Sequence, residues 1–429
     1  MTSRPRPAAL AAAVVLAAAS LTACADQSGS APAAANTVET ATSEVEVFTW
    51  WASGSEKVGL DALVDELGAR HPHVRFVDAA VAGGAGSAAK DLLQSRLQAN
   101  DPPDTFQVHA GAELWDYVEA GQIEDVAHLY VQLGLRDAFP DELVERLLVD
   151  GKIYSIPANI HRANVVWANP GVLAAAGLDP AAAYPTVEDW LAAFEVVEAA
   201  GRTPLAVATT WTQVHLLETI LLAELGPEAY VGLWDGTTEW ASAEVTAALE
   251  TFEKVMSFTN NDRDGLDWPD ATQRVMDGEA AFTVMGDWAL AAFTEAGKVE
   301  GTDFTYFPVP GTHGVFDFLA DSFTLPVGAP NPEGARAWLE VVGSVEGQVE
   351  FNLAKGSIPA RVDIDPTLFS PYQQTAISSF TEDTIVPSLA HGAATRIAWL
   401  NAISDATSRF TTGGSDLETF QADLVAAAG

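Results

Sequence analysis

The sequence has little positive charge, little cysteine and no long apolar run near its start, and each shortage excludes something. It holds 21 lysine and arginine residues against 59 aspartate and glutamate residues, for a formal net charge of −38. No basic stripe is left to pair with phosphate, so binding of nucleic acid is excluded. Cys24 is the only cysteine, so no internal disulfide can form. The apolar run at residues 8–19 is too short to span a bilayer as a mature helix.

That apolar run fits a secretory signal instead. Arg4 and Arg6 precede it, and Leu21-Thr22-Ala23-Cys24 follows. A cysteine directly after small residues at this place resembles a bacterial lipobox, in which the cysteine becomes lipid-modified and is residue one of the mature chain. The alternative is an ordinary cleavage site with an incidental cysteine. We therefore expect a lipoprotein signal peptide over residues 1–23.

The next stretch, residues 24–44, is predicted to be a flexible tether. It is made of small and polar residues with a few acids and shows no apolar period. A lipid on Cys24 with such a tether would hold a folded body at the outer face of the cytoplasmic membrane. We therefore look for a function outside the cell.

The remaining chain predicts an α/β protein. A length of 429 residues suggests two or three domains. Strand and helix patterns alternate over residues 45–120, which is typical of a largely parallel sheet covered by helices. A second lobe is expected from about residue 156, with helices at 187–199, 214–225 and 241–256 and with strands at 205–208 and 280–285. Residues 319–325 read as a strand that returns to the first lobe.

The stretch at residues 45–56 carries the first candidate site residues. A predicted strand ends here, and ligands of open α/β sheets sit outside the carboxyl ends of the strands. Both indoles could instead be core residues, because neighbouring strand residues point to opposite faces. The residues placed at this strand end are Trp50, Trp51, Ser53, Ser55 and Glu56.

Further candidates occur at similar places along the chain. Gln107 and His109 share one face at the end of a strand predicted over residues 105–109. His161 lies at the crossover into the second lobe. Trp268 is expected in a loop. Asp287 and Trp288 follow a strand through glycine, and Asp287 could be either a helix N-cap or a ligand contact.

Two other interpretations of local patterns were weighed. The glycine-rich residues 82–87 precede a helix, but they lack the Gly-Lys-Ser/Thr ending of a P-loop and the spacing of a dinucleotide fingerprint. We reject a nucleotide site. His71 and His73 suggest a metal carrier, but Pro72 separates them and no carboxylate cluster accompanies them. We expect neither a metal nor a cofactor.

Several motifs together resemble the extracellular solute-binding proteins of ABC sugar importers, and within these the glucose and galactose-type monosaccharide binders. The resemblance covers essentially the whole mature chain. Its more discriminating part is the pair Trp50-Trp51 with Phe-Gln-Val-His-Ala-Gly. The motifs are the lipobox, Phe48-Thr49-Trp50-Trp51, Gly83-Gly84-Ala85-Gly86, Asp101-Pro102-Pro103-Asp104-Thr105-Phe106-Gln107-Val108-His109-Ala110-Gly111, Asn159-Ile160-His161-Arg162 and Met285-Gly286-Asp287-Trp288.

The resemblance implies two α/β lobes, a hinge, and a sugar held in the cleft between them. The expected lobes are residues 45–155 with 320–362, and residues 156–319 with 363–429. The family's ligand positions would fall on Trp51, Glu56, Gln107, His109, Trp268, Trp288, Asp321, Lys355 and His391, with Lys355 in a loop at residues 354–359. Tryptophans would stack on a pyranose face, and the polar groups would pair its hydroxyls.

The implied function is a carrier without a catalytic residue. A monosaccharide, glucose or a related hexose, would close the hinge, and the closed monomer would dock on the permease subunits of an ABC importer. The main alternative is a secreted carbohydrate-active enzyme, in which Glu56 and Asp321 would act as opposed carboxylates.

Overall fold

The computed structural model describes residues 43–83 and 86–429. The predictions for the signal peptide and Cys24 therefore lie outside the described residues, as do Gly84 and Ala85. Of the predicted tether, residues 24–42 also lie outside, but Ser43 and Glu44 are described and begin the first strand, so the predicted end of the tether is two residues too late. Among the described residues, no helix has the length and apolar character that a membrane crossing requires. Strands and helices alternate over residues 45–120, as the sequence predicts.

The first sheet has five strands in the order β2-β1-β3-β13-β6. Strands β1, β2 and β3 are parallel, and β13 runs antiparallel between β3 and β6. The predicted return of the chain near residue 320 is thus confirmed, because β13 completes a sheet begun almost 280 residues earlier. The bounds are β1 Ser43–Phe48, β2 Val74–Asp78, β3 Thr105–His109, β6 Ser155–Pro157 and β13 Asp321–Thr324.

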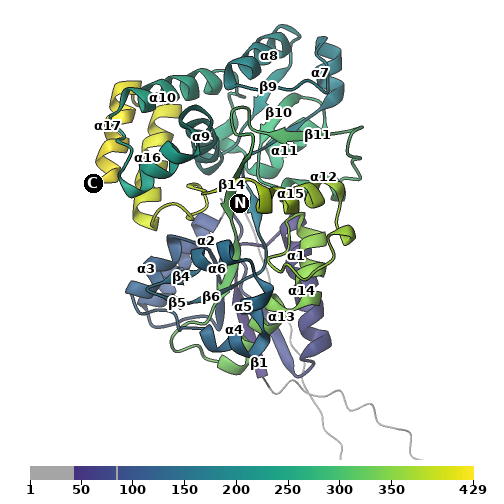
Figure 1. Cartoon of the computed structure of the whole chain (residues 1–429), viewed down its shortest axis with the longest axis vertical. Coiled ribbons are helices and arrows are strands. Elements are labelled where there is room, and N and C mark those ends of the chain that lie inside the picture. The colour runs from purple at the N-terminus through teal and green to yellow at the C-terminus, as the bar shows by residue number, and fades with distance from the viewer. Residues whose placement is uncertain (1–42, 84–85) are drawn as a thin grey trace, which may run out of the picture. The chain divides into compact units, whose positions relative to one another are not determined.

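Helices pack on this sheet through apolar faces. Leu60, Leu63 and Leu67 of α1 follow helical spacing, and all three are buried. Helices α1, α13 and α14 pack against one another, and α13 also contacts β1 and β6 (Figure 1). The bounds are α1 Gly54–Arg70, α2 Ser87–Gln98, α3 Glu113–Glu119, α4 Ala127–Leu133, α5 Leu135–Ala138, α6 Asp141–Arg146, α13 Pro332–Gly343 and α14 Val345–Lys355, with a small ladder of β4 Leu148–Val149 and β5 Lys152–Ile153.

The second sheet has four strands in the order β11-β8-β10-β9. Helices α9 and α10 pack beside α16 and α17 (Figure 1). Helix α9 breaks at Gly226, where φ is 77°, and continues from Pro227. The bounds are β8 Val165–Ala168, β9 Thr203–Ala206, β10 Ala280–Val284, β11 Thr305–Pro308, α7 Pro170–Ala176, α8 Val187–Ala199, α9 Thr210–Asp235, α10 Ala243–Met256, η2 Arg263–Gly265, α11 Trp268–Met276, α12 Ala289–Glu295, α16 Ile397–Thr411 and α17 Leu417–Ala428.

A third sheet lies where the chain passes between the other two. Its order is β14-β12-β7. Along the chain, strand β7 follows β6 of the first sheet and precedes β8 of the second sheet. Only Ala320 separates β12 from β13 of the first sheet. The bounds are β7 His161–Arg162, β12 Val315–Leu319 and β14 Thr384–Pro387, with η3 Pro366–Leu368 and α15 Pro371–Glu382 before β14.

Some local predictions are wrong, and the structure gives the reasons. Trp268 is the first residue of α11 and not part of a loop, because Asp267 and Asp270 form a capping box there. Lys355 is the last residue of α14 and not part of the following loop. Asp287 is not a helix N-cap: Trp288 holds that position before α12.

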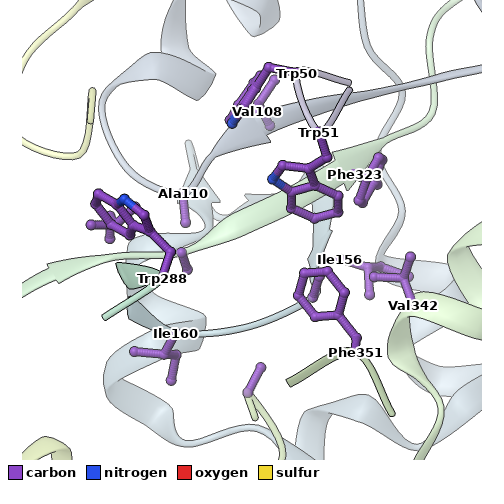
Figure 2. Packing of buried hydrophobic residues seen from close by; sticks show 14 of the residues in the cluster. Trp50, Trp51, Val108, Ala110, Ile156, Ile160, Trp288, Phe323, Val342 and Phe351 are labelled. Carbon is purple, nitrogen blue, oxygen red and sulfur yellow. The ribbon is translucent and has the colours of Figure 1, made fainter. Parts of the chain in front are cut away.

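Buried aromatic side chains join the first sheet to the elements around it. The indole of Trp51 is fully buried, with its ring centroid 4.8 Å from that of Phe351 and 5.6 Å from that of Phe323 (Figure 2). Trp288 belongs to the same buried cluster but comes from the turn after β10 (Figure 2). The expectation that Trp51 could be a core residue is therefore correct as far as burial goes.

Candidate ligand-binding site

A cavity of about 490 Å³ lies at the carboxyl ends of β1 and β3. Its volume falls within the range of about 300 to 1,000 Å³ that is usual for small-molecule sites. Of the twelve residues predicted to contact a ligand, ten line it, and the exceptions are Gln107 and Asp287. The ten are Trp50, Trp51, Glu56, His109, His161, Trp268, Trp288, Asp321, Lys355 and His391.

The turn after β1 forms one wall. Trp51 packs against Phe351 and Phe323 and also faces the cavity, so this core residue is a lining residue as well. Lys355 Nζ lies 5.6 Å from the Trp51 ring centroid. Lys355 Nζ also donates to Glu56 Oε1 at 3.0 Å. The lysine side chain is 2% exposed and the glutamate 21%. A paired cation and anion thus stand next to an indole face, where they can donate to and accept from a polar ligand.

Trp50 lies against the start of α2. Gly86 has φ +88°, and a Cβ there would lie 2.7 Å from the Trp50 ring. Only glycine fits both the left-handed backbone and this close approach. On its other side the Trp50 ring centroid is 4.9 Å from that of His109.

His109 is held by a buried ion pair. Lys90 Nζ donates to Glu113 Oε2 at 2.7 Å, and His109 Nδ1 lies 3.1 Å from the same oxygen. Burial is the largest influence on the pKa of His109 and lowers it, and Lys90 lowers it further. Burial alone would raise the pKa of Glu113, but Lys90 and His109 outweigh it, and the pKa is lowered. The site therefore presents a neutral imidazole beside an ionised carboxylate.

Asp321, the first residue of β13, lines the cavity and contacts several polar side chains there. Its carboxylate accepts from Gln107 Nε2 at 2.8 Å and from Asn159 Nδ2 at 3.0 Å. His161 Nε2 lies 3.2 Å from Asp321 Oδ2. Burial opposes ionisation, yet the hydrogen bond and charge of His161, followed by the charge of Lys355, hold the pKa of Asp321 well below its usual range. Gln107 lies behind the cavity wall, where its carbonyl oxygen accepts from the Thr49 hydroxyl and its amide orients Asp321.

His161 bridges two carboxylates, Asp321 at the start of β13 and Asp287 in the turn after β10. Its Nδ1 is hydrogen-bonded to Asp287 Oδ1, and its Nε2 faces Asp321. Burial would lower the pKa of His161, but the two carboxylates raise it above the ordinary value. Asp287 also accepts from the backbone N–H of Arg162 at 3.1 Å, so it fixes His161 from behind the cavity. Its pKa is raised by burial, against the opposing effect of His161.

His391 closes the cavity from the segment between β14 and α16. Its ring centroid lies 5.1 Å from that of Trp288 and 5.9 Å from that of His109. This segment binds the first sheet's helix α3: the Glu113 N–H donates to Gly392 O at 2.9 Å. Burial, followed by the charges of His215 and His109, lowers the pKa of His391 well below its ordinary value. The imidazole is therefore neutral.

The sequence reasoning missed several lining residues. Trp211, in the first turn of α9, lines the cavity with its ring centroid 6.1 Å from that of His391. Its position soon after strand β9 repeats the arrangement of Trp51 after β1, so this signal was available. Further missed side chains lie on α11, on α12 or directly after it, and carried no local signal: Gln273, Met276, Ala292, Glu295 and Ala296.

The structure gives little support to the two alternative sites suggested by local sequence patterns, a nucleotide site and a metal site. The glycine-rich turn contributes Gly83 and Gly86 to the wall beside Trp50. The rings of His71 and His73 lie 6.1 Å apart, and in the part of the chain that the structure describes no three histidine, cysteine or acidic residues gather as metal ligands. What the cavity presents is flat indole faces surrounded by donors and acceptors, which suits a ring with many hydroxyl groups.

A cavity at strand ends, in which indole faces and polar side chains come from the first and third sheets and from the segments after the strands of the second, is typical of a ligand-binding protein. The profile of the bacterial extracellular solute-binding proteins matches residues 51–349. An uncharacterised ABC transporter extracellular-binding protein of Pyrococcus horikoshii is 34% identical over 86% of this chain and 84% of its own length. A probable sugar-binding periplasmic protein of Brucella suis is 32% identical over 96% and 97%. The chain belongs to the bacterial extracellular solute-binding protein family.

Solved structures share the fold. A chitin oligosaccharide binding protein superposes with a TM-score of 0.79 at 20% identity, covering 90% of this chain and 98% of the other. A bacterial solute receptor described as exclusive for β-D-galactopyranose gives 0.78 at 17% identity, with coverage of 90% and 98%. The predicted two-lobe α/β fold is thereby confirmed.

Proposed function

We propose that this protein captures a monosaccharide, D-glucose or a related hexose, in the cavity and delivers it to an ABC importer. The observation that carries the proposal is that five indoles line the same cavity as polar side chains that other protein groups already hold in place. The indoles belong to Trp50, Trp51, Trp211, Trp268 and Trp288. Indoles bind the C–H face of a pyranose, and each buried hydroxyl left without a partner would cost about 1 to 3 kcal/mol.

The polar groups supply both hydrogen-bonding roles. Asp321 and Glu56 accept, Lys355 donates, and the neutral imidazoles of His109 and His391 can do either. All are held by protein partners before any ligand arrives, which lowers the entropy lost on binding. The cavity volume, in the lower half of the usual range, favours a single sugar ring over a long oligosaccharide.

The lobes proposed for this function are residues 45–155 with 320–362, and residues 156–319 with 363–429. A sugar touching Trp51 on one side and Trp288 on the other would favour the closed arrangement, which we propose docks as a monomer on the permease subunits. The names of the relatives, extracellular-binding and periplasmic, support a place outside the cell. Attachment to the membrane would come from a lipid on Cys24.

A carbohydrate-active enzyme is the weaker candidate. A glycosidase needs one carboxyl group with a raised pKa to protonate the leaving group. Asp321 has a lowered pKa, and Glu56 is paired with Lys355. Release of nitrophenol from aryl-glycosides, or shortening of free oligosaccharides, would reverse this order.

The decisive experiment is a thermal-shift screen of monosaccharides and disaccharides, followed by isothermal titration of each compound that stabilises the protein. A ligand present at 100 times its Kd should add about 2.7 kcal/mol to the unfolding free energy. We expect D-glucose or an epimer to raise the melting temperature most. Stabilisation by disaccharides alone would refute the monosaccharide assignment, and no stabilisation by any sugar would refute the whole proposal.

A further inference from the structure

A hydrogen-bonded path leads from a buried carboxyl group to the cavity wall. Ser388 Oγ lies 3.0 Å from both carboxylate oxygens of Glu218 and 2.8 Å from His391 Nδ1. All three residues are buried. His391 lines the cavity, and its Nε2 is buried without a hydrogen-bond partner among the described residues. The far end of the path is thus a nitrogen left for a ligand.

The single hydroxyl proton of Ser388 allows two arrangements. With Glu218 ionised, Ser388 donates to the carboxylate and accepts from His391 Nδ1–H, so that Nε2 carries a lone pair. With Glu218 protonated, the acid donates to Ser388 Oγ and Ser388 donates to Nδ1, so that Nε2 carries the hydrogen. The two tautomers of one neutral ring therefore offer opposite roles to a ligand.

We propose that Glu218 is a positioning residue that acts through Ser388 to select the tautomer of His391, and so decides whether the cavity wall donates to or accepts from the ligand. This rests on the proposed function, because it assumes a hydroxylated ligand. When the proton is lost, the Glu218 O–H bond breaks and a new Oγ–H bond forms on Ser388. The former Ser388 proton forms the Nδ1–H bond, and the Nε2–H bond breaks, releasing one proton through the cavity.

The surroundings place this change near neutral pH. Burial raises the pKa of Glu218 to about 8, against the opposing effect of Ser388 and the backbone N–H groups of Ala390 and Leu389. Burial and then Glu218 raise the pKa of Asp317 well above its usual range, against the opposing charge of Arg162, which favours the neutral form of Asp317. The other titratable or charged groups that face Glu218, Asp317 or His391 are Tyr230 and His215 of α9, His109 of β3, His161 and Arg162 of β7 and Lys90 of α2.

The first experiment needs no ligand. Nitrogen-15 NMR of the imidazoles, followed from pH 6.5 to 9.5, should show His391 passing from the Nε2–H to the Nδ1–H form with a midpoint near the pKa of Glu218. In Glu218→Gln, the Ala390 N–H, which donates to Glu218 Oε2 at 2.8 Å, should hold the amide oxygen. The amide NH₂ then faces Ser388, and the Nε2–H form should persist at every pH. Glu228→Gln, exposed on the same helix, is the matched control and should titrate as the natural protein does.

The second experiment uses D-glucose and its monofluorinated analogues, because fluorine cannot donate a hydrogen bond. At the one sugar position that faces His391, the ratio of the analogue's Kd to that of glucose should be about fivefold greater at pH 9.5 than at pH 6.5, the effect of one lost hydrogen bond. In Glu218→Gln the ratio should be the same at both pH values. Ser388→Ala, which removes the relay with a small change, should also abolish the dependence.

The outcomes separate the two proposals. An unchanged His391 tautomer across this pH range in the natural protein would overturn the inference about Glu218. A pH effect that persists in Glu218→Gln would also overturn it and would assign the effect to another group such as His161. A tautomer change with no binding of glucose or any other hexose at either pH would support the inference and contradict the proposed monosaccharide function.

Discussion

At the scale of the residue, each indole around the cavity can contribute both to packing and to ligand contact. The relative importance of the two roles differs from one tryptophan to the next. Trp51 is fully buried and belongs to the core, so its removal would affect folding as well as binding. Trp211 is only partly buried, and its Nε1–H donates to Asp267 Oδ1 at 3.3 Å. Trp211 is therefore the better residue for measuring ligand contact alone.

We predict that Trp211→Ala weakens binding of D-glucose by about 1 kcal/mol or more, because stacking area is lost while the core is kept. Isothermal titration measures the change. Trp115→Ala is the matched control: Trp115 is also partly buried but stacks under Arg396 and does not line the cavity. Equal affinity in the two variants would remove Trp211 from the site.

His161 provides a prediction on stability. Its pKa is raised in the folded state by Asp287 and Asp321, in spite of burial. The stabilisation from the imidazolium is therefore complete below the unfolded pKa of about 6.5 and is lost as the pH rises through the higher folded pKa. His161→Gln should lose about 3 kcal/mol or more at pH 6, since two buried carboxylates lose their cation.

Urea unfolding of the natural protein and of His161→Gln, each measured from pH 5 to pH 10, tests this. The difference in unfolding free energy between the two proteins should shrink as the pH rises. A difference that stays constant over the whole range would mean that the imidazole contributes by packing and neutral hydrogen bonds only.

At the scale of the element, the end of α14 comes very close to the start of α12. Gly356 follows α14 with φ +80°, and a Cβ there would lie 3.0 Å from Asp287 O and 3.1 Å from the Ala291 backbone nitrogen. Helix α14 lies in the proposed first lobe and α12 in the proposed second lobe, and α12 also contacts α1. The approach of backbone to backbone is therefore a contact between the proposed lobes that requires glycine.

We predict that Gly356→Ala weakens sugar binding by about 1 to 3 kcal/mol, because the added carbon forces the two helix ends apart and disfavours this arrangement of the lobes. Gly328→Ala is the control, with a similar φ of +79° and open space around the new Cβ. Titration calorimetry on both variants, with thermal unfolding to measure the backbone strain they share, separates the two effects. A loss of affinity of equal size in both would contradict the role of the contact.

Most elements could be predicted from the sequence because their signals are local. Helix α8 has its predicted bounds, because Thr186 and Asp189 form a capping box at its start, and strand β3 also has its predicted bounds. Trp268 shows the limit: Asp-Trp-Pro was interpreted as a loop, although aspartate before a proline in the first helical turn is also a helix start. Only the residues after the proline distinguish the two interpretations, and the capping partner Asp270 was the signal that decided between them.

At the scale of the whole molecule, the strand-end rule placed Trp51 and His109 at the cavity, because it depends on the sheet alone. The family resemblance supplied Lys355 and His391, which local patterns could not place. Gln273 and Glu295 could not be predicted from the sequence, because the orientation of α11 and α12 in the folded protein decides which of their side chains face the cavity. That any of these residues binds a ligand stays a prediction.

The buried acids make stability depend on pH for the molecule as a whole. The pKa of Asp321 is lowered from 3.8, so its stabilisation is present above that value and is lost as the pH falls through the lower folded pKa. The pKa of Glu218 is raised from 4.5 to about 8, so stability falls between these values by up to about 1.4 kcal/mol per pH unit. We predict maximal stability near pH 5, and a shallower decline toward pH 8 in Glu218→Gln.

Thermal unfolding in buffers of constant ionic strength from pH 3 to pH 9 measures the profile. Constant ionic strength matters because the net charge of −38 adds repulsion at high pH that salt screens. A maximum above pH 7, or the same slope in Glu218→Gln as in the natural protein, would show that Glu218 does not behave as its surroundings indicate.

The insertion of β13 between β3 and β6 has a consequence for folding during synthesis of this protein. A ribosome must complete more than three quarters of the polypeptide before the sheet that carries Trp50 and His109 can acquire its missing strand. Until then two strand edges stay open to pairing with other chains. A nascent polypeptide that stops short of Asp321 should therefore aggregate unless a chaperone shields it, however well its opening third is able to form helices.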